Sequence, residues 1–273
     1  NSNINFTNTN VMRADGGRDA NVSGLTVAIH DRTLRYRVRT FGSYSLINRS
    51  TRDVANGYNP TISGFKYSAE LAKIGGVWQY GISRSVESNQ YNINDLGFLR
   101  AANDVSHNGY FRYNLLQPNG IFNRFNSTIS AHHGQLYSPR AFTSFDLSAN
   151  AYAQFKNFWG ISMRYGVRPL QSYDYFEPRT EGYFVSIPSS GSYSVHVESD
   201  SRKPLKGNVY SGRFVRNEWD QDSDWVGVFL RYRVNDKWSL NVEVNAEDNN
   251  NGRGYVTKQT DDVPDHEEII FGE

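Results

Sequence analysis

The sequence predicts an all-β protein, an antiparallel up-and-down outer-membrane β-barrel or a part of one. Two observations support this fold class. Segments of about ten residues alternate apolar and polar side chains. These segments are joined alternately by very short turns and by long polar loops. Short periplasmic turns that alternate with long extracellular loops are typical of outer-membrane barrels.

The alternation is clearest in residues 34–39, 159–168 and 226–234. In the second of these, an apolar series alternates with a small or charged one: Trp159, Ile161, Met163, Tyr165 and Val167 against Gly160, Ser162, Arg164, Gly166 and Arg168. A side-chain period of two gives a strand one apolar face and one polar face. A tilted strand of roughly 9–11 residues is also long enough to cross a bilayer.

The expected strands follow one another along the whole chain, and helix is nearly absent. They lie near 2–12, 20–30, 34–45, 62–72, 76–86, 109–116, 121–131, 143–155, 159–168, 192–200, 207–216, 225–234 and 238–247, with an outermost segment near 255–273. The short turns lie near 30–33, 73–76, 117–120, 156–158, 202–207 and 235–237. The long polar loops lie near 46–61, 87–108, 132–142, 169–191 and 217–224. Gly-Gly and Pro-Asn-Gly in two of the short turns supply the positive φ angles of tight hairpins.

Composition narrows the functional class. The chain has 273 residues, a formal net charge of +1 and no cysteine. No basic block stands out, so we expect no nucleic-acid partner. Without cysteine there are no disulfides, thiol catalysis or thiolate metal sites. No run of 18 apolar residues predicts a membrane-spanning helix. We treat residues 1–273 as a single β-barrel segment with both ends truncated, because both ends read as strand.

Large aromatic residues follow the short turns at matching places: Trp78, Phe122, Trp159 and Trp238. A ring of aromatics at one height is expected at the periplasmic membrane interface. The alternative is that they are ordinary aromatics beside turns, packed in the core of a soluble protein.

The face opposite the apolar one is rich in cations. We assign every second residue of each expected strand to this face. Its cations are then Arg35, Arg37, Arg39, Lys66, Arg112, Arg124, Arg164, Arg168, Arg231 and Arg233, and its acids are Glu70, Asp146, Glu198 and Glu243. A cation-rich lumen would favour anionic solutes. Alternatively, these cations pair with carboxylates of strands or of a plug outside this chain.

Two loop motifs resemble a known family. Residues 91–99 (Tyr-Asn-Ile-Asn-Asp-Leu-Gly-Phe-Leu) resemble one family motif, and 158–160 with 174–180 (Phe-Trp-Gly and Asp-Tyr-Phe-Glu-Pro-Arg-Thr) resemble another. Residues 6–11, 19–22 and 269–272 are also similar to it. The family is an uncharacterised outer-membrane β-barrel domain of Bacteroidota that usually follows a carbohydrate-binding domain similar to family 9. The resemblance implies a fold, a compartment and a link to glycans, but no catalytic or binding residues.

Ligand contacts are expected in the long loops, chiefly 87–108 and 169–191. The second loop carries the residues that we single out as candidates for ligand binding: Tyr173, Tyr175, Phe176, Glu177 and Arg179. Aromatic rings beside acids suit polar ligands such as sugars, although the same residues could instead pack as a lid over the barrel mouth. In the first loop, Asn94 and Asp95 should form a turn by accepting hydrogen bonds from the local backbone.

Catalytic and metal-binding patterns are weak. Asp220, Asp222 and Asp224 have the spacing of a calcium loop. The sixth position is Trp225 and the twelfth is Arg231, which excludes an EF-hand. We expect no metal, no cofactor and no catalytic residue.

The function predicted from the sequence is that of an outer-membrane protein of the bacterial cell envelope. It would transport or anchor at the surface and have a link to glycans. Its expected partners are membrane lipid and lipopolysaccharide, flanking strands and a carbohydrate-binding domain of the same protein, and glycans. Two alternatives remain: a barrel-anchored surface enzyme or glycan-binding protein that acts through its loops, and a soluble all-β binding module.

Overall fold

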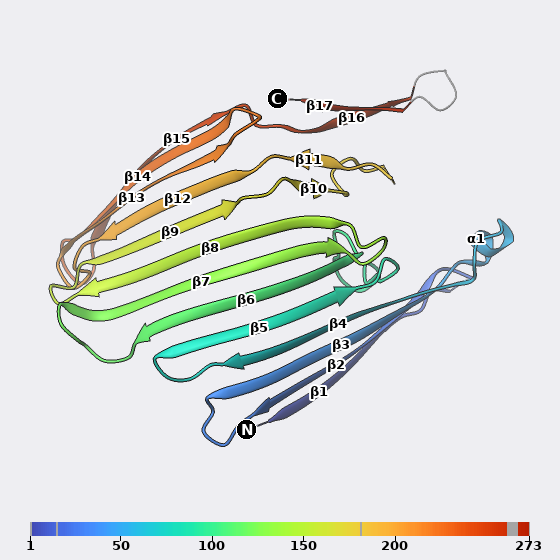
Figure 1. Cartoon of the computed structure of the whole chain (residues 1–273), viewed down its shortest axis with the longest axis horizontal. Helices are drawn as coiled ribbons and strands as arrows, with labels where there is room; N and C mark the ends of the chain where they lie inside the picture. The colour runs from blue at the N-terminus through green and yellow to red at the C-terminus, as the bar shows by residue number, and fades with distance from the viewer. Residues whose placement is uncertain (1, 15, 181, 261–266, 273) are drawn as a thin grey trace. The chain divides into compact units, whose positions relative to one another are not determined.

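The computed structural model describes residues 2–14, 16–180, 182–260 and 267–272. Its regular structure is almost all antiparallel strand (Figure 1). The elements are β1 (Asn3–Val11), β2 (Asp19–His30), β3 (Tyr36–Asn48), α1 (Thr51–Ala55), β4 (Thr61–Lys73), β5 (Trp78–Glu87), β6 (Asp104–Leu115), β7 (Phe122–Leu136), β8 (Phe142–Phe155), β9 (Gly160–Arg168), β10 (Ser172–Asp174), β11 (Val185–Ile187), β12 (Ser190–Glu198), β13 (Leu205–Arg216), β14 (Gln221–Arg233), β15 (Ser239–Asn250), β16 (Gly254–Thr260) and β17 (Glu267–Gly272).

The strands pair with their neighbours in sequence, as predicted. The main sheet has the order β1-β2-β3-β4-β5-β6-β7-β8-β9-β12-β13-β14-β15, and β10–β11 and β16–β17 form two separate hairpins. The order does not return to β1, so among the described residues the sheet does not close. The antiparallel up-and-down topology is therefore confirmed, whereas the barrel itself is not seen. No helix of the described residues is long and apolar enough to span a membrane.

The chain divides into two compact units. The first comprises residues 1–111 and 132–143, and the second comprises residues 112–131 and 144–273. Within each unit the strands show the predicted two faces.

In the first unit, register places the large apolar side chains on one face. Leu71 lies opposite both Val38 and Ile82, while Arg39 lies opposite Glu70 on the other face. The apolar face of this unit carries exposed Ile4, Phe6, Leu25, Ile29, Tyr36, Val38, Leu71, Trp78, Tyr80 and Ile82. Tight burial is found instead where the loop after β5 meets the polar face, at Ser43, Ser45, Ile47, Glu87 and Tyr91.

The second unit repeats this division. Met163 lies opposite Ala151 and Val195, and Val228 lies opposite Val209 and Val244. Its apolar face carries exposed Trp159, Met163, Tyr165, Tyr193, Val209, Val226, Val228, Leu230, Tyr232, Trp238, Leu240, Val242 and Val244. The intervening residues, among them Arg164 and Arg231, occupy the polar face.

Three sequence expectations were wrong in detail. Two predicted long loops, 132–142 and 217–224, are about half strand, because β7 continues to Leu136 and β14 begins at Gln221. Polar side chains at the strand ends hid the extended backbone. Leu34 and Arg35 precede β3 and lie in the turn, where Leu34 has a φ of 56°. The loops also contain α1 and the β10–β11 hairpin, which the alternation did not predict.

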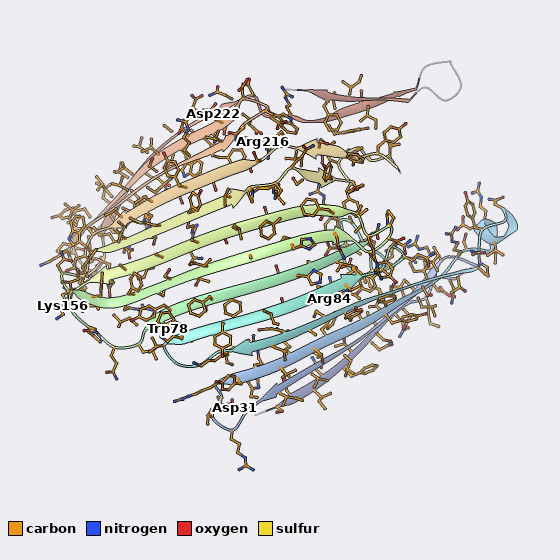
Figure 2. The ribbon with its side chains drawn as sticks, viewed as in Figure 1. Asp31, Trp78, Arg84, Lys156, Arg216 and Asp222 are labelled. Carbon is orange, nitrogen blue, oxygen red and sulfur yellow. The ribbon has the colours of Figure 1, made fainter. Side chains whose placement is uncertain are left out.

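Three of the four aromatics expected beside the short turns are exposed in the structure. Trp78, Trp159 and Trp238 lie exposed on the apolar side at the short-turn ends of β5, β9 and β15 (Figure 2 labels Trp78). Phe122 differs in being only half-exposed, and its ring packs against those of Phe125 and Phe155, each with its centroid 5.5 Å away.

Asp31 organises the short turn between β2 and β3 (Figure 2). Its carboxylate accepts hydrogen bonds from the Thr33 hydroxyl and from the backbone N–H groups of Thr33, Arg35 and Tyr36. These donors, the Thr33 hydroxyl first, lower the pKa of Asp31 from 3.8 to about 2. In the turn between β12 and β13, hydrogen bonds from Arg202 likewise lower the pKa of Asp200 to about 2. The Arg202 guanidinium also lies 3.1 Å from the ring centroid of Phe158, in the neighbouring turn.

We expect the carboxylate of Asp31 to titrate near pH 2 by NMR, and Thr33→Val to move that midpoint up toward 3.8, because it removes the largest cause of the shift. The folded pKa lies below the ordinary value, so the contribution to turn stability is complete above about pH 4 and is lost as the pH falls toward 2. An unchanged midpoint in Thr33→Val would contradict this account.

Candidate functional site

Ion pairs link neighbouring strands across the polar face. Arg37 pairs with Glu70 at 2.5 Å and Lys66 with Glu87 at 2.8 Å in the first unit. Arg168 pairs with Asp146 at 2.8 Å in the second unit. Three of the cations predicted for a lumen are therefore neutralised within the chain itself. Glu87 is only 6% exposed.

The remaining predicted cations are placed as follows. Arg39, Arg164, Arg231 and Arg233 lie on the polar face by register. Arg112 donates to the Thr128 hydroxyl at 2.9 Å. Thr128 lies on the same face of β7 as Arg124 and Ser130. The Ser130 hydroxyl lies 2.8 Å from the hydroxyl of Ser148, which is on the polar face. Arg35 is the exception, because it lies in a turn and not on a strand.

The loop 88–103, called here the inner loop, folds onto the polar face of β3 and β4. The Tyr91 hydroxyl donates to Ser43 Oγ at 2.9 Å, and the Asn92 backbone N–H donates to Ser45 Oγ at 3.1 Å. A Cβ at Gly64 would lie 2.2 Å from the Tyr91 nitrogen, so only glycine permits this approach. The inner loop thus covers polar strand residues that water would otherwise reach.

Asp95 holds the inner loop to the connection between β1 and β2. Its carboxylate lies 2.9 Å from Arg13 Nη2 and 2.7 Å from Arg18 Nη2, and Arg18 Nε donates to it at 2.9 Å. The side chain is 11% exposed. The expected local turn is correct for Asn94, which accepts from the Leu99 N–H at 2.6 Å, but Asp95 pairs with distant arginines instead.

A polar pocket of about 510 Å³ lies between the inner loop, the start of β4 and the segment before it. Five carboxamide side chains line it: Asn59, Asn89, Gln90, Asn92 and Asn94. Arg49 and Arg100 also line it, together with Tyr91, Ile62, Leu99 and smaller residues, and none of the described residues of the lining is an acid. The sequence placed a ligand surface in 87–108 but did not identify this site. The run of amides at 89–94, followed by Arg100, was the signal in the sequence that could have indicated this pocket. That signal did not include Arg49 and Asn59, which come from another loop.

The second predicted ligand loop, 169–191, packs largely on itself and on β16. Phe184 contacts Tyr173 and Tyr175, with ring centroids 5.4 and 5.3 Å away. Glu177 Oε1 accepts from the Tyr255 N–H at 3.3 Å, and the Arg179 guanidinium lies 4.5 Å from the Tyr255 ring centroid. Of the five predicted residues, Phe176 and Arg179 are exposed, and the other three are half-buried. Ligand binding by this loop stays a prediction.

The alternating acids at the start of β14 do not form a cation site. Asp222 and Asp224 lie 3.5 and 3.4 Å from Arg213 on the adjacent strand, whereas Asp220 lies in a turn with a φ of 49°. Among the residues that the structure describes, no group of three or more His, Cys, Asp or Glu side chains is arranged to hold a metal ion.

Replacing Asp95 with asparagine should release the inner loop, because it removes the charge that two arginines share. We expect faster amide hydrogen exchange across residues 91–99, and a cost of about 1–2 kcal/mol for a partly buried pair of this kind. Exchange in β3 and β4 should be unchanged. Asp236→Asn, in an exposed turn, is the control. Equal exchange in both variants would refute the role of Asp95.

Comparison with known proteins gives one match. A family described as "Domain of unknown function (DUF5916)" matches residues 1–273. No curated protein and no solved structure matches the chain. The chain therefore belongs to the DUF5916 family.

Proposed function

We propose that this sheet lies in a bacterial outer membrane, with its apolar face against lipid and its polar face toward the interior of a barrel. The observation that supports it is the apolar face itself. In the described residues, Met163 is 50%, Ile82 66% and Leu240 61% exposed, and each belongs to a row of apolar side chains across several strands. Monomeric soluble proteins rarely expose so large an apolar surface.

The apolar rows have the length and the ends that a membrane requires. From Trp159 to Val167 the strand extends roughly 26 Å, comparable to the apolar band of about 25 Å in outer-membrane proteins. Toward the loops the rows end in polar residues: Arg84 on β5 (Figure 2), Asp224 on β14 and Asp248 on β15. Tryptophans mark the opposite end.

Within β1 and β2, the loop end of the apolar face carries amides in place of hydrocarbon. Asn8 Nδ2 donates to Ser23 Oγ at 2.7 Å, and Asn10 Nδ2 donates to Asn8 Oδ1 at 2.7 Å. Asn21 joins the same cluster. Such side chains suit the headgroup layer, where lipopolysaccharide would lie.

We favour anchoring over transport. The inner loop covers part of the polar face of the first unit, and several charged side chains of that face are paired. A polar face that is covered in this way suits an anchor better than an open pore. The edges of β1 and β15 would need strand partners in lipid, because unpaired backbone groups there are costly. An origin in Bacteroidota and an adjoining carbohydrate-binding domain are parts of this proposal that rest on the resemblance of the loop motifs.

Brominated lipid distinguishes the two faces directly, because bromine quenches tryptophan fluorescence on contact. Single-tryptophan variants that keep Trp159 or Trp225 form a matched pair. Trp159 lies on the apolar face, and Trp225 lies on the polar face against Gly212. We expect strong quenching of Trp159 and little of Trp225. Equal quenching, or recovery of the protein outside the outer-membrane fraction, would refute the proposal.

Met163→Arg should cost roughly 2–4 kcal/mol of folding free energy in lipid, because arginine would lie at mid-membrane depth. In water the half-exposed position would tolerate arginine. Ser162→Arg, on the polar face one residue away, is the control and should cost much less. Unfolding by urea in lipid vesicles measures both, and similar losses in both variants would contradict a lipid-facing Met163.

A further inference from the structure

We propose that an apolar groove across strands β2 to β6 holds one phospholipid whose headgroup carries both a phosphate and a primary ammonium group, phosphatidylethanolamine. This inference rests on the proposed function and deepens it, because it names a lipid for one place on the apolar face. The groove has a volume of about 830 Å³, in the range of small-molecule sites, and involves only residues of the first unit.

Two rows of side chains across the strands form the walls of the groove. One wall is hydrocarbon throughout, and register places its members side by side: Ile29, Val38, Leu71 and Ile82. The other wall lies nearer the short turns and adds charged and phenolic groups: Asp31, Tyr36, Lys73 and Tyr80. The rows are two residues apart along each strand, which is about 7 Å. The residues between them point to the polar face, so backbone forms the floor on which a hydrocarbon chain can lie.

Gly109 on β6 keeps one end of the groove open. It lies on the apolar face, because Phe111, two residues later, stacks on exposed Trp78 with ring centroids 5.3 Å apart. Among the described residues, the nearest contact of a Cβ at Gly109 would be the Gly81 carbonyl oxygen, 4.0 Å away. A larger residue would therefore fill the groove without displacing the sheet.

Lys73 supplies a cation for the headgroup phosphate. It is half-buried, and register places it between Tyr36 and Tyr80. Its Nζ lies 5.9 Å from the ring centroid of Tyr80, and among the residues that the structure describes it forms no ion pair. Lysine and tyrosine at the end of an apolar face keep their hydrocarbon in lipid and their polar ends at the headgroups. Lipid phosphates are the anions at that depth.

Asp31 supplies the opposite charge on the same row. Its backbone N–H donates to the Tyr36 carbonyl at 3.1 Å, so the β2–β3 ladder continues to this pair. Asp31 and Lys73 are thus two strand spacings apart, roughly 10 Å. A phosphate and an ammonium group joined by two carbons fit between them. A headgroup with phosphate alone would be repelled by Asp31, and a quaternary ammonium group has no N–H to donate to a carboxylate.

Native mass spectrometry of the whole chain tests the proposal by counting the lipid molecules that it retains. The protein is equilibrated with an equimolar mixture of phosphatidylethanolamine, phosphatidylcholine and phosphatidylglycerol that have identical acyl chains. We expect one phosphatidylethanolamine to be retained, at least about tenfold over each of the other two. Equal retention of phosphatidylglycerol would overturn the match to both charges. Equal retention of phosphatidylcholine would overturn the hydrogen bond from the ammonium group.

Variants place the lipid in this groove. Lys73→Gln should lower retention about tenfold, and Lys73→Arg, which keeps the charge, should restore most of it. Gly109→Leu should also release the lipid, because leucine fills the groove. Gly42→Leu is its matched control, since Gly42 lies on the same face of β3, outside the groove lining, with nothing within 4 Å of its Cβ position. Equal retention in Gly109→Leu and Gly42→Leu would overturn the assignment.

Quenching of Trp159 by brominated lipid, measured on the same samples, separates this inference from the proposed function. Trp159 lies in the second unit, away from the groove residues in the sequence. Strong quenching without any preference for phosphatidylethanolamine would overturn the groove and leave the membrane location standing. Weak quenching would overturn both. Strong quenching in each variant also confirms that the variant has inserted with its sheet folded.

Discussion

The two-residue period of the strands is the constraint on which the rest of this structure depends. It places every second side chain on one face, so a single choice of register separates hydrocarbon from charge over the whole sheet. The pairing of Leu71 with both Val38 and Ile82 carries the apolar row across three strands. A slip by one residue would bring Arg39 and Glu70 onto that face. Register is therefore strongly specified even though few residues are buried.

The inner loop depends on the same division. It can fold onto the sheet because the polar face offers the Ser43 and Ser45 hydroxyls, and because Gly64 lets the backbone come close. Asp95 then ties the loop to the neighbouring connection through two arginines. The loop also leaves the amides of Asn92 and Asn94 as donors beside Arg49, so packing on the sheet and shaping of the pocket come from one arrangement.

The sequence predicts the strands well because alternation is a local signal. It locates β9 and β14 within a few residues and the pairing of each strand with its neighbours. It fails where polar residues continue a strand, as in residues 132–135 near the end of β7, since polarity suggests a loop. It also misses contacts between distant segments. Nothing near Asp95 identifies Arg13 as its partner, and nothing near Arg100 places Arg49 in the same pocket.

Charge is distributed differently on the sheet and in the loops of the first unit. On the polar face, Lys66 and Glu87 neutralise one another. This ion pair links two neighbouring strands and leaves little net charge there. In the loops, the single carboxylate of Asp95 pairs with two arginines at once, Arg13 and Arg18. In both places the paired charges connect segments that are distant in the sequence. The chain's net charge of +1 does not show this distribution, because the distribution depends on which distant residues the fold brings together.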